Sequence, residues 1–93
     1  MKIDITSRNF TLNEKLKVFT FEKINKLSKY DKYIISARIV LLKESRAEKV
    51  ELFVSSKNNK YISKCYTSVF EKTIIKAVKN IVSQIKKNKE NFN

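Results

Sequence analysis

Six lysines in the C-terminal part of the chain recur at the spacing of a helix. They are Lys72, Lys76, Lys79, Lys86, Lys87 and Lys89. The first four share one ridge of the predicted helix, which only Ser83 interrupts, and the last two extend it. Like charges at this spacing repel and destabilise an isolated helix. A solvated helix surface normally includes glutamate, so the ridge favours contact with phosphate groups.

A second basic set belongs to the predicted first helix. Lys23, Lys26 and Lys29 follow one another at spacings of three, and Arg8 is expected in the loop before the helix. Two adjacent helices with basic ridges would form a groove suited to a folded RNA backbone. Lysines neutralise phosphates as point charges, so such contacts position a protein and read little sequence.

The chain as a whole is basic, with 21 Lys and Arg against nine Asp and Glu and a formal net charge of +12. Abundant Lys, Ile and Asn are typical of A/T-rich coding sequence, but that bias does not explain the excess of lysine over acidic residues. The excess predicts a polyanionic partner, nucleic acid above all. Residues 1–30, 31–67 and 68–93 each carry +4. The folded body, and not a tail, is therefore the expected binding surface.

The residues on which most enzymes depend are missing. The chain has no histidine and no glycine, which excludes histidine-based catalysis, the usual zinc ligand sets and glycine-rich phosphate loops. Its single cysteine, Cys65, lacks a histidine to activate it and excludes an internal disulfide. We expect no enzyme activity, no metal, no cofactor and no small-molecule substrate.

Nothing in the sequence indicates a membrane or a secretory route. No apolar run approaches the roughly 18–20 residues of a membrane span. The N-terminus, Met1–Thr6, has no apolar leader segment. We expect a cytoplasmic protein that has no membrane partner and is monomeric when free.

Two helices are predicted from capping boxes and apolar stripes. Thr11 with Glu14 opens a helix to about Lys29, and Ser68 with Glu71 opens another to about Asn88. The first stripe comprises Leu12, Leu16, Phe19, Thr20, Ile24 and Leu27, and the second Phe70, Ile74, Ala77, Val78, Ile81 and Ile85. Both stripes are expected to face a core.

Four strands are predicted from alternating apolar residues, at 1–6, 33–43, 48–56 and 61–66. Residues 7–9 form the first loop, and Asn58-Asn59 is the only good turn in the stretch that holds the last three strands. Two sets of residues should face the core: Ile35, Ala37, Ile39 and Leu41, and Val50, Leu52 and Val54. Tyr33, Phe53, Tyr61 and Tyr66 are candidates for base stacking on the other face, although ordinary strand packing is favoured.

The resulting order is β-α-β-β-β-α, an α+β fold in one domain spanning 1–93. Its stable arrangement is a four-stranded sheet with both helices packed on one face.

These residues resemble a known family. The segments Ile5-Thr6-Ser7-Arg8-Asn9, Glu22–Tyr30 and Gln84–Lys89 are similar to the signature of ribosome hibernation promoting factors. This family is also called ribosome-associated inhibitor A or the sigma-54 modulation family. The similarity in element order covers nearly the whole chain, whereas the specific motif matches cluster near its two ends.

The resemblance implies a function. Members of the family bind the small ribosomal subunit in the channel of mRNA and of the A- and P-site tRNAs, and block translation during stationary phase or stress. By motif match, Arg8, Lys23, Lys26 and Lys29 would contact ribosomal RNA, together with Lys86, Lys87 and Lys89. Lys72, Lys76 and Lys79 are added from the helical ridge alone. The chain ends at Asn93, so we expect no C-terminal dimerisation domain and action on single ribosomes, with any pairing of ribosomes left to a separate partner.

Two alternatives stay open. A sheet with two helices on one face is also the architecture of double-stranded-RNA modules, so a general RNA-binding domain is one of them. The other is a transcription-modulating interaction protein, as the older family name suggests.

Overall fold

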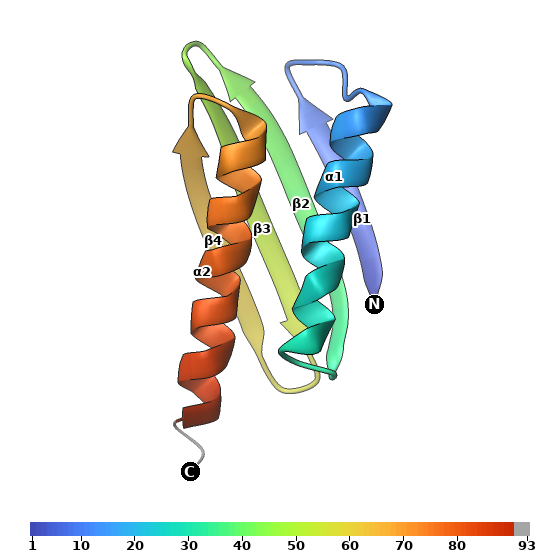
Figure 1. Cartoon of the computed structure of the whole chain (residues 1–93), viewed down its shortest axis with the longest axis vertical. Coiled ribbons are helices and arrows are strands. Elements are labelled where there is room, and N and C mark those ends of the chain that lie inside the picture. The colour runs from blue at the N-terminus through green and yellow to red at the C-terminus, as the bar shows by residue number, and fades with distance from the viewer. Residues whose placement is uncertain (91–93) are drawn as a thin grey trace.

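Alternation of apolar and polar residues builds four strands, as the sequence predicts. The computed structural model describes residues 1–90, with strands β1 (Lys2–Arg8), β2 (Ile34–Glu44), β3 (Ala47–Ser56) and β4 (Lys60–Thr67). They pair in the order β1-β2-β3-β4, with β1 parallel to β2 and the other neighbours antiparallel. The element order is β-α-β-β-β-α, which confirms the predicted α+β fold (Figure 1).

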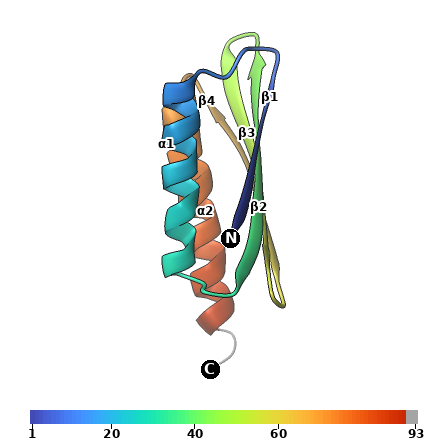
Figure 2. The same ribbon diagram turned by 90° about the vertical axis from the view of Figure 1, so that its right-hand side faces the viewer.

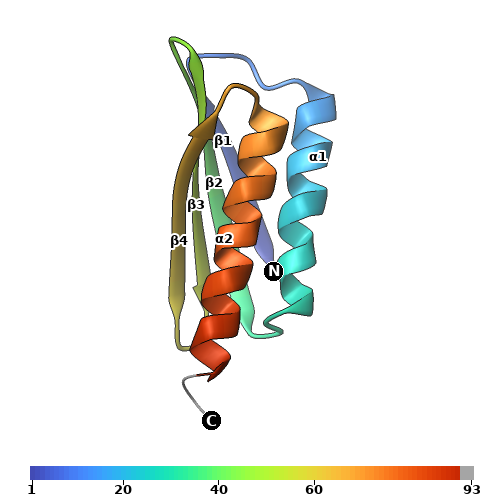
Figure 3. The ribbon, with the colours of Figure 1, turned by 60° about the vertical axis from the view of Figure 1, so that its left-hand side comes forward.

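Two helices cover one face of this sheet. α1 (Glu14–Asn25) continues as a 3₁₀ turn, η1 (Lys26–Lys29), and α2 (Phe70–Glu90) is the last element. Figure 2 shows both helices on the same side of the sheet, and Figure 3 shows them side by side and running in the same direction. Both therefore begin at one end of a molecule 44 Å long and finish at the other.

The core lies between the helices and the sheet. The two predicted helical stripes supply buried side chains, among them Ile24, Leu27, Ile74, Ile81 and Ile85. Strands β2 and β3 supply Ala37, Ile39, Leu41, Val50, Leu52 and Val54. Burying a side chain of this size is worth about 1.5–3 kcal/mol, so the two stripes fix both helices on the sheet.

The start of β2 differs from the sequence prediction. Ile35 was expected to face the core, but it is 62% exposed and its neighbour Ile34 is buried instead. The pairing of β2 with β3 shifts between Ile34 and Ser36. Such an irregularity adds a residue to one strand and turns its side chain to the other face, which simple alternation cannot reveal.

The first loop also begins later than predicted. Ser7 and Arg8 continue β1, paired with Leu41 and Leu42 of β2, and the chain turns only at Asn9, whose φ is 68°. Asparagine tolerates this left-handed conformation better than most residues, which suits it to the turn in a chain without glycine.

The helices start differently from the predicted capping boxes. Asn13 caps α1, and its side-chain oxygen accepts the Leu16 amide proton at 2.8 Å, so Thr11 is not the N-cap. α2 begins at Phe70, whose amide donates to Glu48 Oε1 of β3 at 2.7 Å. The predicted capping box of Ser68 with Glu71 is therefore wrong. A cap supplied by a neighbouring strand leaves no signal in the local sequence.

One hairpin turn was missed and the other was found. Ser45 and Arg46 alone join β2 to β3, with φ of 43° at Ser45. Asn58 and Asn59 do lie in the β3–β4 turn, which the Ser56 amide closes by donating to the Asn59 carbonyl at 2.8 Å. Neither asparagine adopts the positive φ that the prediction invoked.

Replacing Glu48 should destabilise the fold through the start of α2. We expect Glu48→Ala to lower the free energy of unfolding by about 1 kcal/mol, the usual cost of a lost N-cap. Urea unfolding followed by circular dichroism measures this. Glu51→Ala is the matched control on the same strand, because Glu51 forms only an exposed ion pair with Lys64 and should change stability by less than about 0.5 kcal/mol. Equal losses in both variants would contradict the capping role.

Candidate nucleic-acid interface

The helix layer, formed by α1, η1 and α2, concentrates positive charge. It holds eleven of the 21 basic residues, with three on α1, two on η1 and six on α2. Nine of the ten predicted site residues lie here: Lys23, Lys26, Lys29, Lys72, Lys76, Lys79, Lys86, Lys87 and Lys89. Eight of these nine are exposed, and Lys23 is half-buried. Because the apolar stripes face the sheet, the lysines face solvent.

Ion pairing distinguishes the helix layer from the sheet. Among side chains of residues 1–89, the ion pairs join Lys43 to Glu48, Lys49 to Glu44 and Lys64 to Glu51. All six partners lie on β2, β3 or β4. Within this described range the lysines of the helix layer have no carboxylate at ion-pair distance, so their charge is available to an external anion.

Three glutamates lie at one end of the molecule, where Lys15 and Lys43 are also found. Glu14, Glu48 and Glu71 lie where the two helices begin, and carboxylates are favoured beside free helical amides. Lysines gather where the helices finish, including Lys29 and Lys89. A cation at a helix C-terminus complements the helix dipole, but that effect involves only the last turn of each helix.

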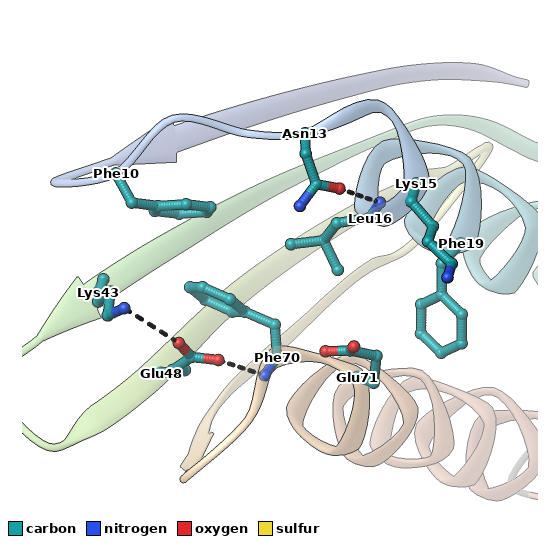
Figure 4. Close-up of a pocket in the computed structure, with 9 residues that line it drawn as sticks. All are labelled: Phe10, Asn13, Lys15, Leu16, Phe19, Lys43, Glu48, Phe70 and Glu71. Atoms are coloured by element: carbon teal, nitrogen blue, oxygen red, sulfur yellow. Dashed lines mark hydrogen bonds and ion pairs between the residues drawn. The ribbon is translucent and has the colours of Figure 1, made fainter.

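An open cleft of about 400 Å³ lies at the end where the helices begin. In Figure 4 the rings of Phe10 and Phe70 stack there, with their centroids 4.7 Å apart. Glu48 and Glu71 also line the cleft, together with two lysines, so its charges are balanced. This balance does not favour phosphate, and the stacked rings pack the first loop onto α2.

Arg8 does not share the surface of the helix layer. Ile3 and Ile5 of β1 pack against the core beneath the helices, and Arg8 alternates with them, so its side chain lies on the opposite, open face of the sheet. The expected position in a loop below the first helix is therefore wrong. The RNA contact that the resemblance implies for Arg8 is untested, and a binding face formed by the helix layer would leave Arg8 out of the contact.

The four candidate stacking residues separate into different environments. Tyr61 is buried in the core, and this burial raises the pKa of its hydroxyl group. Phe53 lies on the open face beneath the Arg38 guanidinium, 4.8 Å from its ring centroid, and Tyr66 is 65% exposed. Tyr33 lies just before β2, with the Lys32 and Lys57 ammonium groups near its ring.

The sequence analysis did not identify three residues at the end of the molecule where both helices finish: Tyr30, Lys32 and Lys57. Lys86 lies over the Tyr30 ring, although the two are far apart in the sequence. The local signal was the segment Tyr30-Asp31-Lys32-Tyr33, in which two tyrosines flank two charged residues.

The sequence profile of one family, described as "Sigma 54 modulation protein / S30EA ribosomal protein", matches residues 3–93. The chain belongs to this family. The match confirms the resemblance of the N-terminal and C-terminal motifs. Members of the S30EA family are non-enzymatic factors, in agreement with the expectation drawn from the missing histidine and glycine.

Two solved structures have the same fold as this S30EA family member. A ribosomal subunit interface protein from Coxiella burnetii is 17% identical, with a TM-score of 0.89 over 97% of this chain and 99% of that chain. The N-terminal domain of Protein Y from Thermus thermophilus is 19% identical, with a TM-score of 0.86 over 95% and 99%. A search of curated proteins gives no significant match. Within residues 1–90, neither helix combines the length and apolarity needed to cross a bilayer.

The helix layer and the open face of the sheet can be compared as RNA-binding surfaces by removing one positive charge from each. We expect Lys79→Gln to reduce the salt dependence of RNA binding by about one unit of the log–log slope, since one phosphate contact is lost. Arg8→Gln, the matched neutralisation on the open face, should leave the slope unchanged. Filter binding of a labelled RNA hairpin across a salt series measures both slopes. A larger effect from Arg8 would reverse the assignment of the binding face.

Proposed function

We propose that the chain binds the small ribosomal subunit through its helix layer, occupies the channel of mRNA and of the A- and P-site tRNAs, and thereby blocks translation. The observation that carries this proposal is the exposed lysine surface without carboxylate partners among the described residues. A surface of this kind is suited to an RNA backbone and needs no particular base sequence.

Among possible polyanionic partners, family membership favours the ribosome. The family description includes a ribosomal protein, and one structural relative is described as a ribosomal subunit interface protein. Ribosomal RNA is the polyanion that such an interface presents. On this proposal the lysines of the helix layer neutralise the phosphates of ribosomal RNA.

Occlusion requires binding and rigidity but no chemistry. The helices and the sheet share one continuous buried core, so the domain binds as one rigid body 44 Å long. A rigid body held in a channel for nucleic acid excludes tRNA and mRNA by volume alone. Action in the cytoplasm during stationary phase or stress completes the proposal and comes from the family resemblance.

Co-sedimentation with isolated small subunits tests this function. We expect about one chain per subunit, displaced by initiator tRNA and resistant to excess duplex RNA. Binding that exceeds this ratio and is lost equally to any RNA would instead indicate a general double-stranded-RNA module. No binding to subunits would favour the transcription-modulating interaction protein.

Charge reversal on α1 and η1 should strongly weaken the interaction. We expect Lys23→Glu with Lys26→Glu to weaken small-subunit binding on the order of a hundredfold, because two phosphate contacts become repulsive. Lys49→Glu with Lys64→Glu makes the same change of charge on the strands and should bind as the unmodified chain does. Circular dichroism tests whether both variants fold. Full retention of binding by the first variant would refute the helix-layer site.

A further inference from the structure

The end of the molecule at which both helices finish presents two exposed tyrosines among lysines. Tyr30, which follows η1, is 38% exposed, and Tyr33, which precedes β2, is 56% exposed. The Lys86 ammonium lies 5.6 Å from the Tyr30 ring centroid. The ammonium groups of Lys32 and Lys57 lie 5.3 and 5.8 Å from the Tyr33 ring centroid. The loop 30–33, the β3–β4 turn and α2 thus meet and surround two aromatic rings with positive charge.

A buried aspartate fixes the loop that carries both rings. Asp31 accepts the Tyr33 amide proton through Oδ1 at 2.9 Å and the Ser56 hydroxyl proton through Oδ2 at 2.7 Å, which ties the loop to β3. The Tyr33 carbonyl accepts the Lys57 amide proton at 3.1 Å. The Tyr30 carbonyl accepts a proton from Lys89 Nζ of α2. A loop held in this way is ordered before it binds, which lowers the entropy cost of binding.

We propose that Tyr30 and Tyr33 stack on unpaired bases of a single-stranded RNA segment, while the lysines beside the rings neutralise its phosphates. The inference rests on the proposed function and deepens it, because it names the kind of RNA that this end of the helix layer takes. Asp31, the acidic side chain of this loop, is buried and has both oxygens occupied within the protein. It therefore does not exclude an RNA segment from the rings.

Stacking and lysine contact are compatible at these rings. An exposed cation–π pair is weaker than the stacking of a base on an aromatic ring, so a base displaces the ammonium group from the ring. The displaced lysine stays on its flexible stem beside the nucleotide and reaches the phosphate. Paired bases hide their faces inside a helix, so only a single strand, bulge or loop can use the tyrosines.

A fluorescent substitution distinguishes stacking from charge attraction. The chain contains no tryptophan, so Tyr33→Trp introduces a single indole fluorophore at the proposed site. The probe is a single-stranded RNA of about ten nucleotides, within the usual site size for such binding. We expect this RNA to quench the indole emission, and the same sequence in a duplex to leave the emission unchanged. Equal quenching by both would overturn the inference.

Affinity for the same single strand gives a second readout. We expect Tyr30→Ala with Tyr33→Ala to bind about tenfold more weakly, and Tyr30→Phe with Tyr33→Phe to bind as the unmodified chain does. Tyr66→Ala is the matched control, since Tyr66 is an exposed tyrosine on the open sheet face and should not affect binding. Unchanged affinity in the folded double alanine variant would overturn the inference.

The outcomes separate this inference from the proposed function. If the unmodified chain binds small subunits but the tyrosine variants bind the single strand normally, the stacking site is wrong and the proposed function stands. If the single strand quenches the indole and the unmodified chain does not bind small subunits, the stacking site is supported and the proposed function fails.

Discussion

Burial of two apolar helical stripes against one face of the sheet is the interaction on which the rest of the structure depends. Each buried isoleucine or leucine contributes about 1.5–3 kcal/mol. Repulsion between lysines one turn apart costs about 0.2–0.5 kcal/mol for each pair. The stripe of α2 buries Ile74, Ile81 and Ile85, so packing outweighs the repulsion among the lysines on its outer side. A strongly basic surface is stable here because the opposite side of each helix is firmly anchored.

Topology decides where that basic surface gathers. Parallel pairing of β1 with β2 requires a crossover, and α1 provides it, so α1 runs antiparallel to both strands. β4 is antiparallel to β3 and therefore parallel to β2, and α2 returns along it. Both helices consequently run in the same direction, and their C-terminal lysines meet at one end. The tyrosines of the loop after η1 lie at this same end, so the proposed phosphate contacts and the proposed base stacking would share one surface.

The sequence was sufficient for those features that repeat along an element. The helical stripes, the order of helices and strands along the chain, and the outward-facing lysines follow from periodicity, and the structure agrees with each of them. The sequence was insufficient to predict features that depend on contacts between segments far apart in the chain. Glu48 of β3 caps α2, and the register shift between β2 and β3 exposes Ile35. β1 extends two residues further than predicted, through Ser7 and Arg8, which places Arg8 on the open face of the sheet. The sequence also could not predict the lysines around Tyr33, because Lys57 is distant in the sequence and approaches the ring only in the folded chain.

The central claim is that the helix layer, and not the open face of the sheet, faces ribosomal RNA. The most direct measurement is a cryo-electron-microscopy reconstruction of the chain bound to the isolated small subunit. The account predicts density in the tRNA channel, with α1 and α2 against the RNA backbone and the strands turned away. A chain bound through the strand face that carries Arg8 and Phe53, or bound outside the channel, would contradict it.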